Sequence, residues 1–210
     1  MNAYCGQTRE RNLVKLLQER GVGECTVRGE LKSRKRSPWF YDNGAYRDWQ
    51  GGKDFNAVQF HRDCRRMRIE RERGIACPDF VVMPDRVAAG PASLEFSSTF
   101  VRECEGLPCY LALQDGMTED HLVKALAWFA EAGTDVRGLF VGGTTEWKIG
   151  TARAWVRFAH ARELALHIGR VGTPDRVAWA ASIGADSIDS CLPIMFTSVH
   201  LHPFLAAIAA

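Results

Sequence analysis

Short apolar runs alternate with longer amphipathic stretches along most of this chain. The runs are three or four residues long and are bounded by Gly, Pro, Asp or Asn. Such runs are typical of buried β-strands. The predicted strands cover residues 3–5, 24–27, 39–41, 80–83, 110–113, 139–141, 166–168 and 185–188.

Apolar positions at helical spacing lie between most of these runs. In the clearest case, Leu122, Leu126 and Phe129 share one face behind Thr118 as N-cap. A long Arg-rich helix is expected to begin at Asp54 as its N-cap. The predicted helices cover residues 12–20, 54–73, 93–103, 118–133, 146–163, 173–184 and 198–209, and the helix between the second and third strands is missing or stunted.

The alternation of strands and helices predicts an α/β fold with a parallel sheet. About eight strand–helix units favour a compact (β/α)8 TIM barrel, with an open doubly wound sheet as the alternative. We find no linker, low-complexity segment or repeat, so residues 1–210 are predicted to form a single domain.

Composition narrows the class of protein without identifying it. The chain is 46% hydrophobic and 25% charged, with a formal net charge of +2, so overall charge does not indicate a nucleic-acid partner. Its seven dispersed cysteines form no C-x-x-C pair, which favours reduced thiols, a cytoplasmic location and no metal site. We see no signal peptide and no apolar run of membrane-spanning length, and we expect no cofactor.

Polar and glycine-rich turns follow the predicted strands at their carboxyl ends. In a TIM barrel, active-site groups collect at that end, so the one-sided distribution predicts a catalytic mouth. The turns are Asp42-Asn43-Gly44, Pro84-Asp85, Gln114-Asp115-Gly116, Gly142-Gly143, Gly169-Arg170-Val171-Gly172 and the acidic stretch that contains Asp186 and Asp189.

Two carboxylates on different strands, Asp42 and Asp189, are suited to act as nucleophile and acid/base at a glycosidic carbon. Asp85 and Gln114 offer hydrogen-bonding groups to the edge of a purine-like nucleobase. The glycines at 142 and 143 let the backbone approach a flat ligand. Each feature also has a structural explanation.

Those structural explanations stay open here. An Asp at a strand end often caps the next helix, and a Gly-Gly pair often makes only a tight turn. The Gly169–Gly172 turn before a capped helix could instead hold a phosphate. His167 is expected to be a strand residue with a satisfied ring, and an Arg-rich helix is usually a solvated face.

At these motifs the chain resembles the tRNA-guanine transglycosylase superfamily. The segment 184–193 is similar to the family's G-x-D-x-F-D-x-x-x-P segment, with Ile188 in place of the aromatic residue. The turn at Asp42 is similar to the family's D-S-G-G-[FY]. Four further segments match in family order. Pro84-Asp85 is similar in position to the family's base-recognising Asp, and Gln114-Asp115-Gly116 resembles its Q-G-G turn. Gly142-Gly143 resembles its G-G pair, and Val171-Gly172-Thr173-Pro174 resembles its V-G-x-P helix start.

The resemblance implies a role for each matched residue. Asp189 would be the nucleophile and Asp42 the general acid/base, while Asp186 has a supporting or structural role. Asp85, Gln114, Gly142 and Gly143 would bind a 7-deazaguanine (preQ0-like) nucleobase, and Tyr46 or Trp49 would stack on it. The basic residues expected to contact phosphates are Lys32, Arg34, Lys35 and Arg36, with the Arg62–Arg73 helix as a further candidate.

Departures from the family bear on the nucleic acid that would be modified. The sequence after Pro193 reads Ile194-Met195-Phe196-Thr197 rather than the family's basic T-R-x-G-R run. No Cys/Cys/Cys/His zinc subdomain follows. The chain is therefore more similar to the phage and bacterial deazaguanine DNA transglycosylases, and DNA is the expected partner, with tRNA as the alternative.

Two readings from other classes also remain. One is a non-catalytic subunit that only binds nucleic acid. The other is an unrelated barrel enzyme that binds a phosphorylated metabolite at Gly172 and Thr173.

Overall fold

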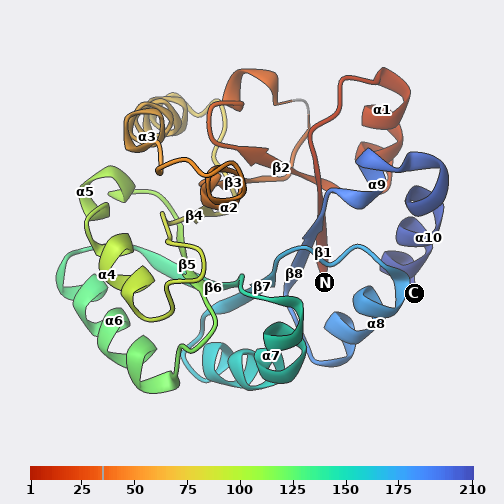
Figure 1. The fold of residues 1–210 in the computed structure, drawn as a ribbon. Helices are drawn as coiled ribbons and strands as arrows, with labels where there is room; N and C mark the ends of the chain where they lie inside the picture. Colours follow the sequence, from red (N-terminus) through yellow and green to blue (C-terminus); the bar gives the residue numbers. More distant parts are fainter. Residues whose placement is uncertain (35) are drawn as a thin grey trace.

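The computed structural model describes residues 1–34 and 36–210 and has a closed barrel of eight parallel strands as its centre (Figure 1). The strands follow one another around the barrel in chain order, and β1 pairs with β8 to close it. The predicted TIM barrel is thus confirmed, and the open sheet is excluded. The strands are β1 (Asn2–Gly6), β2 (Gly23–Val27), β3 (Trp39–Asp42), β4 (Val81–Val82), β5 (Cys109–Leu113), β6 (Val136–Val141), β7 (Ala165–Ile168) and β8 (Ser187–Ser190).

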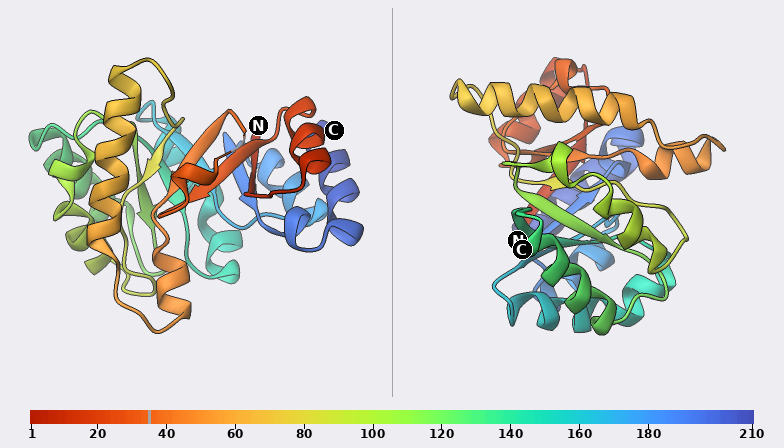
Figure 2. Two further views of the ribbon diagram at one scale, coloured as in Figure 1. Left: turned by 90° about the horizontal axis from the view of Figure 1, so that it is seen from above. Right: turned by 90° about the vertical axis from the view of Figure 1, so that its left-hand side faces the viewer.

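Helices surround this ring, as the further views in Figure 2 also show. Between β2 and β3 the described residues contain only the 3-10 turn η1 (Leu31–Ser33), which confirms the predicted stunted connection. The helices are α1 (Arg11–Glu19), α2 (Ala45–Gln50), α3 (Ala57–Glu72), α4 (Ala92–Ser98), α5 (Val101–Cys104), α6 (Glu119–Glu131), α7 (Thr145–His160), α8 (Pro174–Ser182), α9 (Leu192–Met195) and α10 (Thr197–Ala209).

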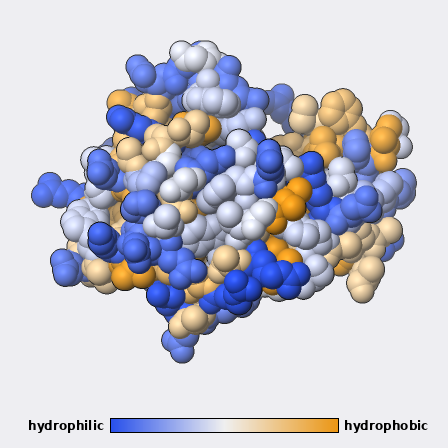
Figure 3. Space-filling view, turned by 60° about the horizontal axis from the view of Figure 1, so that its bottom comes forward, coloured by the Kyte–Doolittle hydropathy of each residue, from blue (hydrophilic) through white to orange (hydrophobic). Residues whose placement is uncertain are grey.

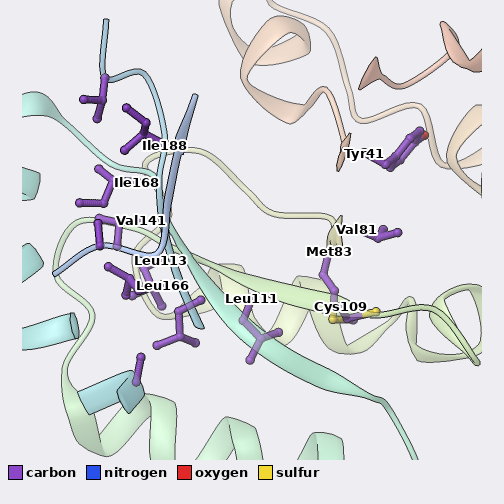
Figure 4. Packing of buried hydrophobic residues seen from close by; sticks show 14 of the residues in the cluster. Tyr41, Val81, Met83, Cys109, Leu111, Leu113, Val141, Leu166, Ile168 and Ile188 are labelled. Atoms are coloured by element: carbon purple, nitrogen blue, oxygen red, sulfur yellow. The ribbon is translucent and has the colours of Figure 1, made fainter. Parts of the chain in front are cut away.

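Alternation along the strands separates an inner core from an outer one. On β3, Phe40 faces the barrel interior, while Trp39 and Tyr41 belong to the outer core between strands and helices. Inside, Phe80 stacks between Phe40 and Tyr110, with ring centroids 4.6 and 3.9 Å apart. Figure 4 shows part of the outer layer on several strands. The stacked rings fill the barrel interior, and polar side chains complete it on β7, β8 and the end of β3.

Several element boundaries differ from the sequence predictions. Helix α3 begins at Ala57 because Asn56, rather than Asp54, caps it by accepting a hydrogen bond from the Gln59 N–H at 3.0 Å. The short helix α2 was not predicted, since six residues are too few to show a helical repeat. The segment predicted as one helix over 93–103 forms α4 and α5, which are separated by a turn.

Strand β8 also differs in position. It covers Ser187–Ser190, so Asp189 lies within the strand instead of following it. Ser187 and Asp189 point into the barrel, where both contact the His167 ring, and Ile188 points into the outer core. This placement makes Asp189 an inward-facing residue near the carboxyl end of the barrel.

The surface is mostly hydrophilic on the face drawn in Figure 3. Apolar surface gathers at its right-hand side, the side on which Figure 1 shows α10. Among the described residues, no helix is long and apolar enough to cross a membrane.

Candidate active site at the barrel mouth

Asp189 of β8 points into the barrel and is nearly buried, with 7% of its surface exposed. Its Oδ1 lies 3.0 Å from His167 Nε2 and accepts a longer hydrogen bond, 3.3 Å, from the backbone N–H of Arg170. The neighbouring Gly169 leaves room for this carboxylate, since a Cβ there would lie 3.4 Å from Oδ1 and 2.7 Å from the Phe140 ring. The carboxylate is therefore held on one side, by groups from β7.

His167 is a functional candidate that the sequence analysis did not select. It was expected to be a strand residue with a satisfied ring, and it is: Nδ1 lies 2.8 Å from Ser187 Oγ, and the ring stacks on Phe140 at 4.8 Å. Its other nitrogen, however, contacts the predicted nucleophile. The available signal was alternation, because Ala165 and His167 share the inward face of β7.

The protonation of His167 follows from its surroundings. Burial lowers the pKa of the ring below its usual value, and the neighbouring Asp189 carboxylate opposes that shift. A neutral imidazole has one N–H donor and one acceptor. The tautomer that satisfies both contacts carries its proton on Nε2, donates to Asp189 and accepts from the Ser187 hydroxyl.

Lys148 is a second group near Asp189 that sequence reasoning missed. It lies at the start of α7 and is 4% exposed, with its Nζ donating to the carbonyl oxygen of Gly169. Burial, together with the positive charge of Arg170, lowers the pKa of its amine to about 7, against the opposing effect of the Asp189 carboxylate. A positive or neutral amine therefore stands close to the candidate nucleophile near neutral pH.

Asp42 ends β3 and shares the inward face with Phe40. Its Oδ1 accepts a hydrogen bond of 2.6 Å from the Gly44 N–H. Burial raises the pKa of this carboxyl group to about 6, the Gly44 hydrogen bond opposes the shift, and the negative charge of Asp189 adds to it. The two carboxyl groups thus influence each other electrostatically at the same mouth.

Asp85 is held at the mouth by two amide side chains. Asn43 Nδ2 donates to Oδ1 at 2.8 Å, and Gln114 Nε2 donates to Oδ2 at 2.6 Å. Burial raises the pKa of the Asp85 carboxyl group to about 6; the two amide hydrogen bonds oppose the shift, and the charge of Asp42 adds to it. The sequence-predicted pair of Asp85 and Gln114 is therefore in direct contact, and Asn43 joins it.

Gly142 and Gly143 follow β6 beside this group, and both glycines are explained by local packing. A Cβ at Gly142 would lie 3.0 Å from the Leu113 carbonyl oxygen and 3.2 Å from Gln114 Nε2. Gly143 has a φ of +65°, and a Cβ there would lie 2.3 Å from Asp115 Oδ1. The structure thus brings Gly142 next to the amide of Gln114, while the Gly143 turn is shaped by Asp115.

Tyr46 lies on α2 and is 38% exposed. The guanidinium of Arg170, from the turn after β7, sits over its ring at 4.4 Å from the centroid and also donates to the Gly143 carbonyl oxygen. The alternative stacking residue, Trp49, is more exposed at 53%. One face of the Tyr46 ring is therefore covered by Arg170, which joins the turn after β7 to the turn after β6 and to α2.

Asp186 has the structural role expected of it. Its Oδ2 accepts a hydrogen bond from the Leu166 N–H at 2.7 Å and lies 2.9 Å from His160 Nε2. It precedes β8, at the end of the barrel opposite the mouth.

The predicted phosphate-contacting residues fall into different environments. Lys32 is exposed, and Lys35 lies outside the described residues. Arg34 lies 3.4 Å from Glu70 and over the Trp39 ring at 4.3 Å, so its charge is already paired.

The assignment of Arg36 to nucleic-acid binding is wrong. Its side chain is buried, donates to the carbonyl oxygens of Cys5 and Gly23, and lies 3.8 Å from Glu24. Its side chain thus binds backbone groups of β1 and β2 just before β3 begins. A buried guanidinium committed to these carbonyl groups cannot reach a phosphate.

The Arg-rich helix α3 also uses several of its charges within the protein. Arg66 pairs with Glu70 at 2.7 Å, and Arg68 donates to the Glu103 carbonyl oxygen at 2.6 Å. Arg71 donates to the Gly106 carbonyl oxygen. The Arg66–Glu70 pair lies within α3, while the contacts of Arg68 and Arg71 join α3 to the α5 region.

Within residues 1–34 and 36–210, no group of three or more His, Cys, Asp or Glu side chains is arranged to hold a metal ion. A scan of protein-family models finds no match to the chain, and a search of curated proteins finds none.

Proposed function

We propose that the protein is a base-exchange transglycosylase that replaces guanine in DNA with a 7-deazaguanine (preQ0-like) nucleobase. The observation that carries the proposal is the pair of carboxyl groups, Asp189 on β8 and Asp42 on β3, that face one barrel mouth, where the charge of Asp189 raises the pKa of Asp42. Beside them stands Asp85, fixed by two amides, as a recognition group for a purine edge. Two carboxyl groups with distinct surroundings suit a double displacement at an anomeric carbon.

In the first step, an oxygen of Asp189 attacks C1′ of the target nucleotide and forms an ester bond to it. The C1′–N9 bond breaks, and its electron pair leaves with guanine. The protonated form of Asp42 donates a proton to the leaving nucleobase, which is released neutral. A pKa of about 6 keeps part of the Asp42 population protonated near neutral pH.

In the second step, the incoming nucleobase occupies the vacated pocket. The Asp42 carboxylate removes its N9 proton, and N9 attacks C1′ as the ester to Asp189 breaks. The electron pair returns to Asp189, and Asp42 is again protonated for the next cycle. Two inversions give net retention at C1′, as in retaining glycosidases.

His167 supports this role of Asp189 by restricting its orientation. The hydrogen bond from Nε2 engages Oδ1, which leaves Oδ2 for the attack on C1′. Lys148 adds a positive charge nearby in its protonated form. The leaving carboxylate of the second step would be stabilised by the same neighbours.

Recognition of the nucleobase is assigned to the group around Asp85. A carboxylate accepts hydrogen bonds from the N1–H and amino group of a guanine-like ring, and Gln114 and the Gly142 backbone border the same space. Tyr46 offers an aromatic surface once Arg170 moves aside. A target nucleotide in DNA must leave the stack to reach this pocket, which costs least in a single strand or a distorted duplex.

DNA is favoured over tRNA by the residues after Pro193. The family's basic run is replaced by Ile194-Met195-Phe196-Thr197, and Met195 and Phe196 are exposed apolar residues there. The phosphorylated-metabolite alternative is disfavoured at Gly172, since a Cβ at that turn would lie 2.1 Å from Ser190 Oγ. That hydroxyl is occupied with the Leu192 N–H, so the turn is already filled.

The test is exchange of labelled guanine into nucleic acid. Purified protein is incubated with labelled guanine and either single-stranded DNA, duplex DNA or tRNA, and label in the polymer is counted. Exchange into DNA that is abolished in Asp189→Asn supports the proposal. Exchange only into tRNA favours the alternative acceptor, while exchange into neither polymer contradicts the proposed activity.

A further inference from the structure

A basic hollow lies apart from the carboxyl residues Asp42, Asp85 and Asp189. It forms between the start of α1 and the η1 turn. Its lining consists of Arg9, Arg11, Val14, Lys32 and Ser33. The two arginines and the lysine are exposed, so their charged groups are accessible to a ligand.

The position of this hollow relates it to the barrel mouth. Its residues come from the loops that follow β1 and β2, at the carboxyl ends of those strands. Around the barrel, β1 and β2 are the strands between β8, which carries Asp189, and β3, which carries Asp42. The hollow therefore lies at the same end of the barrel as the two carboxyl groups, on the strands between them.

The three cations of the hollow are not engaged in ion pairs among the residues that the structure describes, whereas nearby Glu30 pairs with Arg47 at 2.9 Å. Helix α1 begins at the hollow, and its N-cap Glu10 makes no side-chain capping bond. The free N–H groups of that first turn add to the positive field.

We propose that this hollow binds a backbone phosphate of the nucleic-acid strand, next to the nucleotide whose sugar is presented to Asp189. The inference rests on the proposed function and extends it by naming where the strand is held. Two exposed arginines and one exposed lysine suit a phosphate diester, which accepts several charge-assisted hydrogen bonds. The same chemistry would also suit free phosphate, which the experiment separates.

The test compares two triple variants with the wild type. Arg9→Ala/Arg11→Ala/Lys32→Ala removes the cations of the hollow, and Arg20→Ala/Lys124→Ala/Arg153→Ala removes two arginines and one lysine from exposed positions elsewhere. Both carry the same change in net charge. Fluorescence anisotropy of a labelled single-stranded guanine-containing DNA is measured over a range of NaCl concentrations.

The hollow variant is expected to bind more weakly, with a salt slope flatter by about 0.7 for each phosphate contact removed. The control triple variant is expected to keep the wild-type slope. Equal losses in both variants would overturn the proposal, because they would reflect net charge alone. Competition by inorganic phosphate beyond that of chloride at equal ionic strength would assign the hollow to free phosphate and would also overturn it.

This outcome can be separated from the proposed activity. If the wild type and the two triple variants show the expected salt slopes but the wild type exchanges no guanine, the phosphate site is supported and the transglycosylase proposal fails. If guanine exchange depends on Asp189 but both triple variants bind DNA alike, the proposed activity is supported and the phosphate site in the hollow is rejected.

Discussion

His167 Nε2 lies 3.0 Å from Asp189 Oδ1 inside the barrel, and this contact joins the last two strands at the candidate reaction centre. The ring is fixed from its other side by the Ser187 hydroxyl and by stacking on Phe140. It therefore holds Asp189 without depending on solvent. A carboxylate held by a rigid neutral ring is oriented before substrate binds, which is how positioning residues lower a barrier.

Replacing His167 with Phe is expected to slow formation of the Asp189 ester by about 10- to 100-fold, because the carboxylate loses its orienting donor. His167→Gln, whose amide can still donate to Asp189, is expected to recover part of the rate. Single-turnover adduct formation measures both, with nucleic-acid affinity as the control that should stay unchanged. Equal rates in the wild type and His167→Phe would show that the ring only fills the barrel.

Asp42 links the site to stability and pH. Its pKa is about 6 in the folded protein, above the ordinary value of 3.8. The folded state therefore binds more protons than the unfolded state between these values, and stability falls as pH rises through this window. A shift of this size corresponds to about 3 kcal/mol.

Asp42→Asn keeps the acceptor for the Gly44 N–H but removes this titration. In urea unfolding, the free energy of unfolding of the variant relative to the wild type should rise by about 2 to 3 kcal/mol between pH 4 and pH 7. Exchange activity should be lost. Asp54→Asn, at an exposed carboxylate, is the matched control. A constant difference between wild type and Asp42→Asn across this range would contradict the assigned environment.

Asp85→Asn tests nucleobase recognition. The substitution replaces an acceptor-only carboxylate by a group that also donates, and it disturbs the contacts from Asn43 and Gln114. We expect kcat/KM for guanine exchange to fall by about 100-fold or more, because a site built for specific hydrogen bonds discriminates strongly. Adduct formation with an excess of nucleic acid reports on the sugar chemistry separately. An unchanged kcat/KM would remove Asp85 from the recognition group.

Arg36→Ala tests the buried position of this arginine. Removing the guanidinium deletes its hydrogen bonds to carbonyl groups of β1 and β2 and its ion pair with Glu24. The free energy of unfolding is expected to drop by about 3 to 5 kcal/mol, as when one member of a buried ion pair is deleted. Arg20→Ala, at an exposed site, should change it by less than about 0.5 kcal/mol. Similar small effects for both variants would place Arg36 at the surface.

The barrel was predictable because its signals are local. Short apolar runs with turn residues after them identify the strands, and the polar turns identify the end at which chemistry collects. Asp85 and Gln114 were expected at this mouth because both follow neighbouring strands, and the structure adds their direct hydrogen bond. Asp42 and Asp189 face one mouth for the same reason.

Other parts of the site depend on tertiary contacts that no local pattern contains. Alternation on β7 could have placed His167 inside the barrel, but its contact with Asp189 is tertiary. Lys148 became a candidate only through its burial and its interaction with the Asp189 charge, and Arg170 only because its guanidinium reaches Tyr46 across the mouth. Arg36 belongs to a basic run of a kind that is usually solvated, yet its side chain is buried against carbonyl groups of β1 and β2. Helix α3 begins at Ala57 because the Asn56 side chain, and not that of Asp54, accepts the Gln59 N–H of its first turn.

The central claim is that Asp189 forms a covalent bond to the sugar of the target nucleotide. The most direct measurement is a denaturing gel of protein mixed with guanine-containing single-stranded DNA, with mass spectrometry to locate the modified residue. We expect a slower-migrating adduct in the wild type, an ester at Asp189, and no adduct in Asp189→Asn. An adduct that persists in Asp189→Asn, or guanine exchange that continues in that variant, would contradict the account.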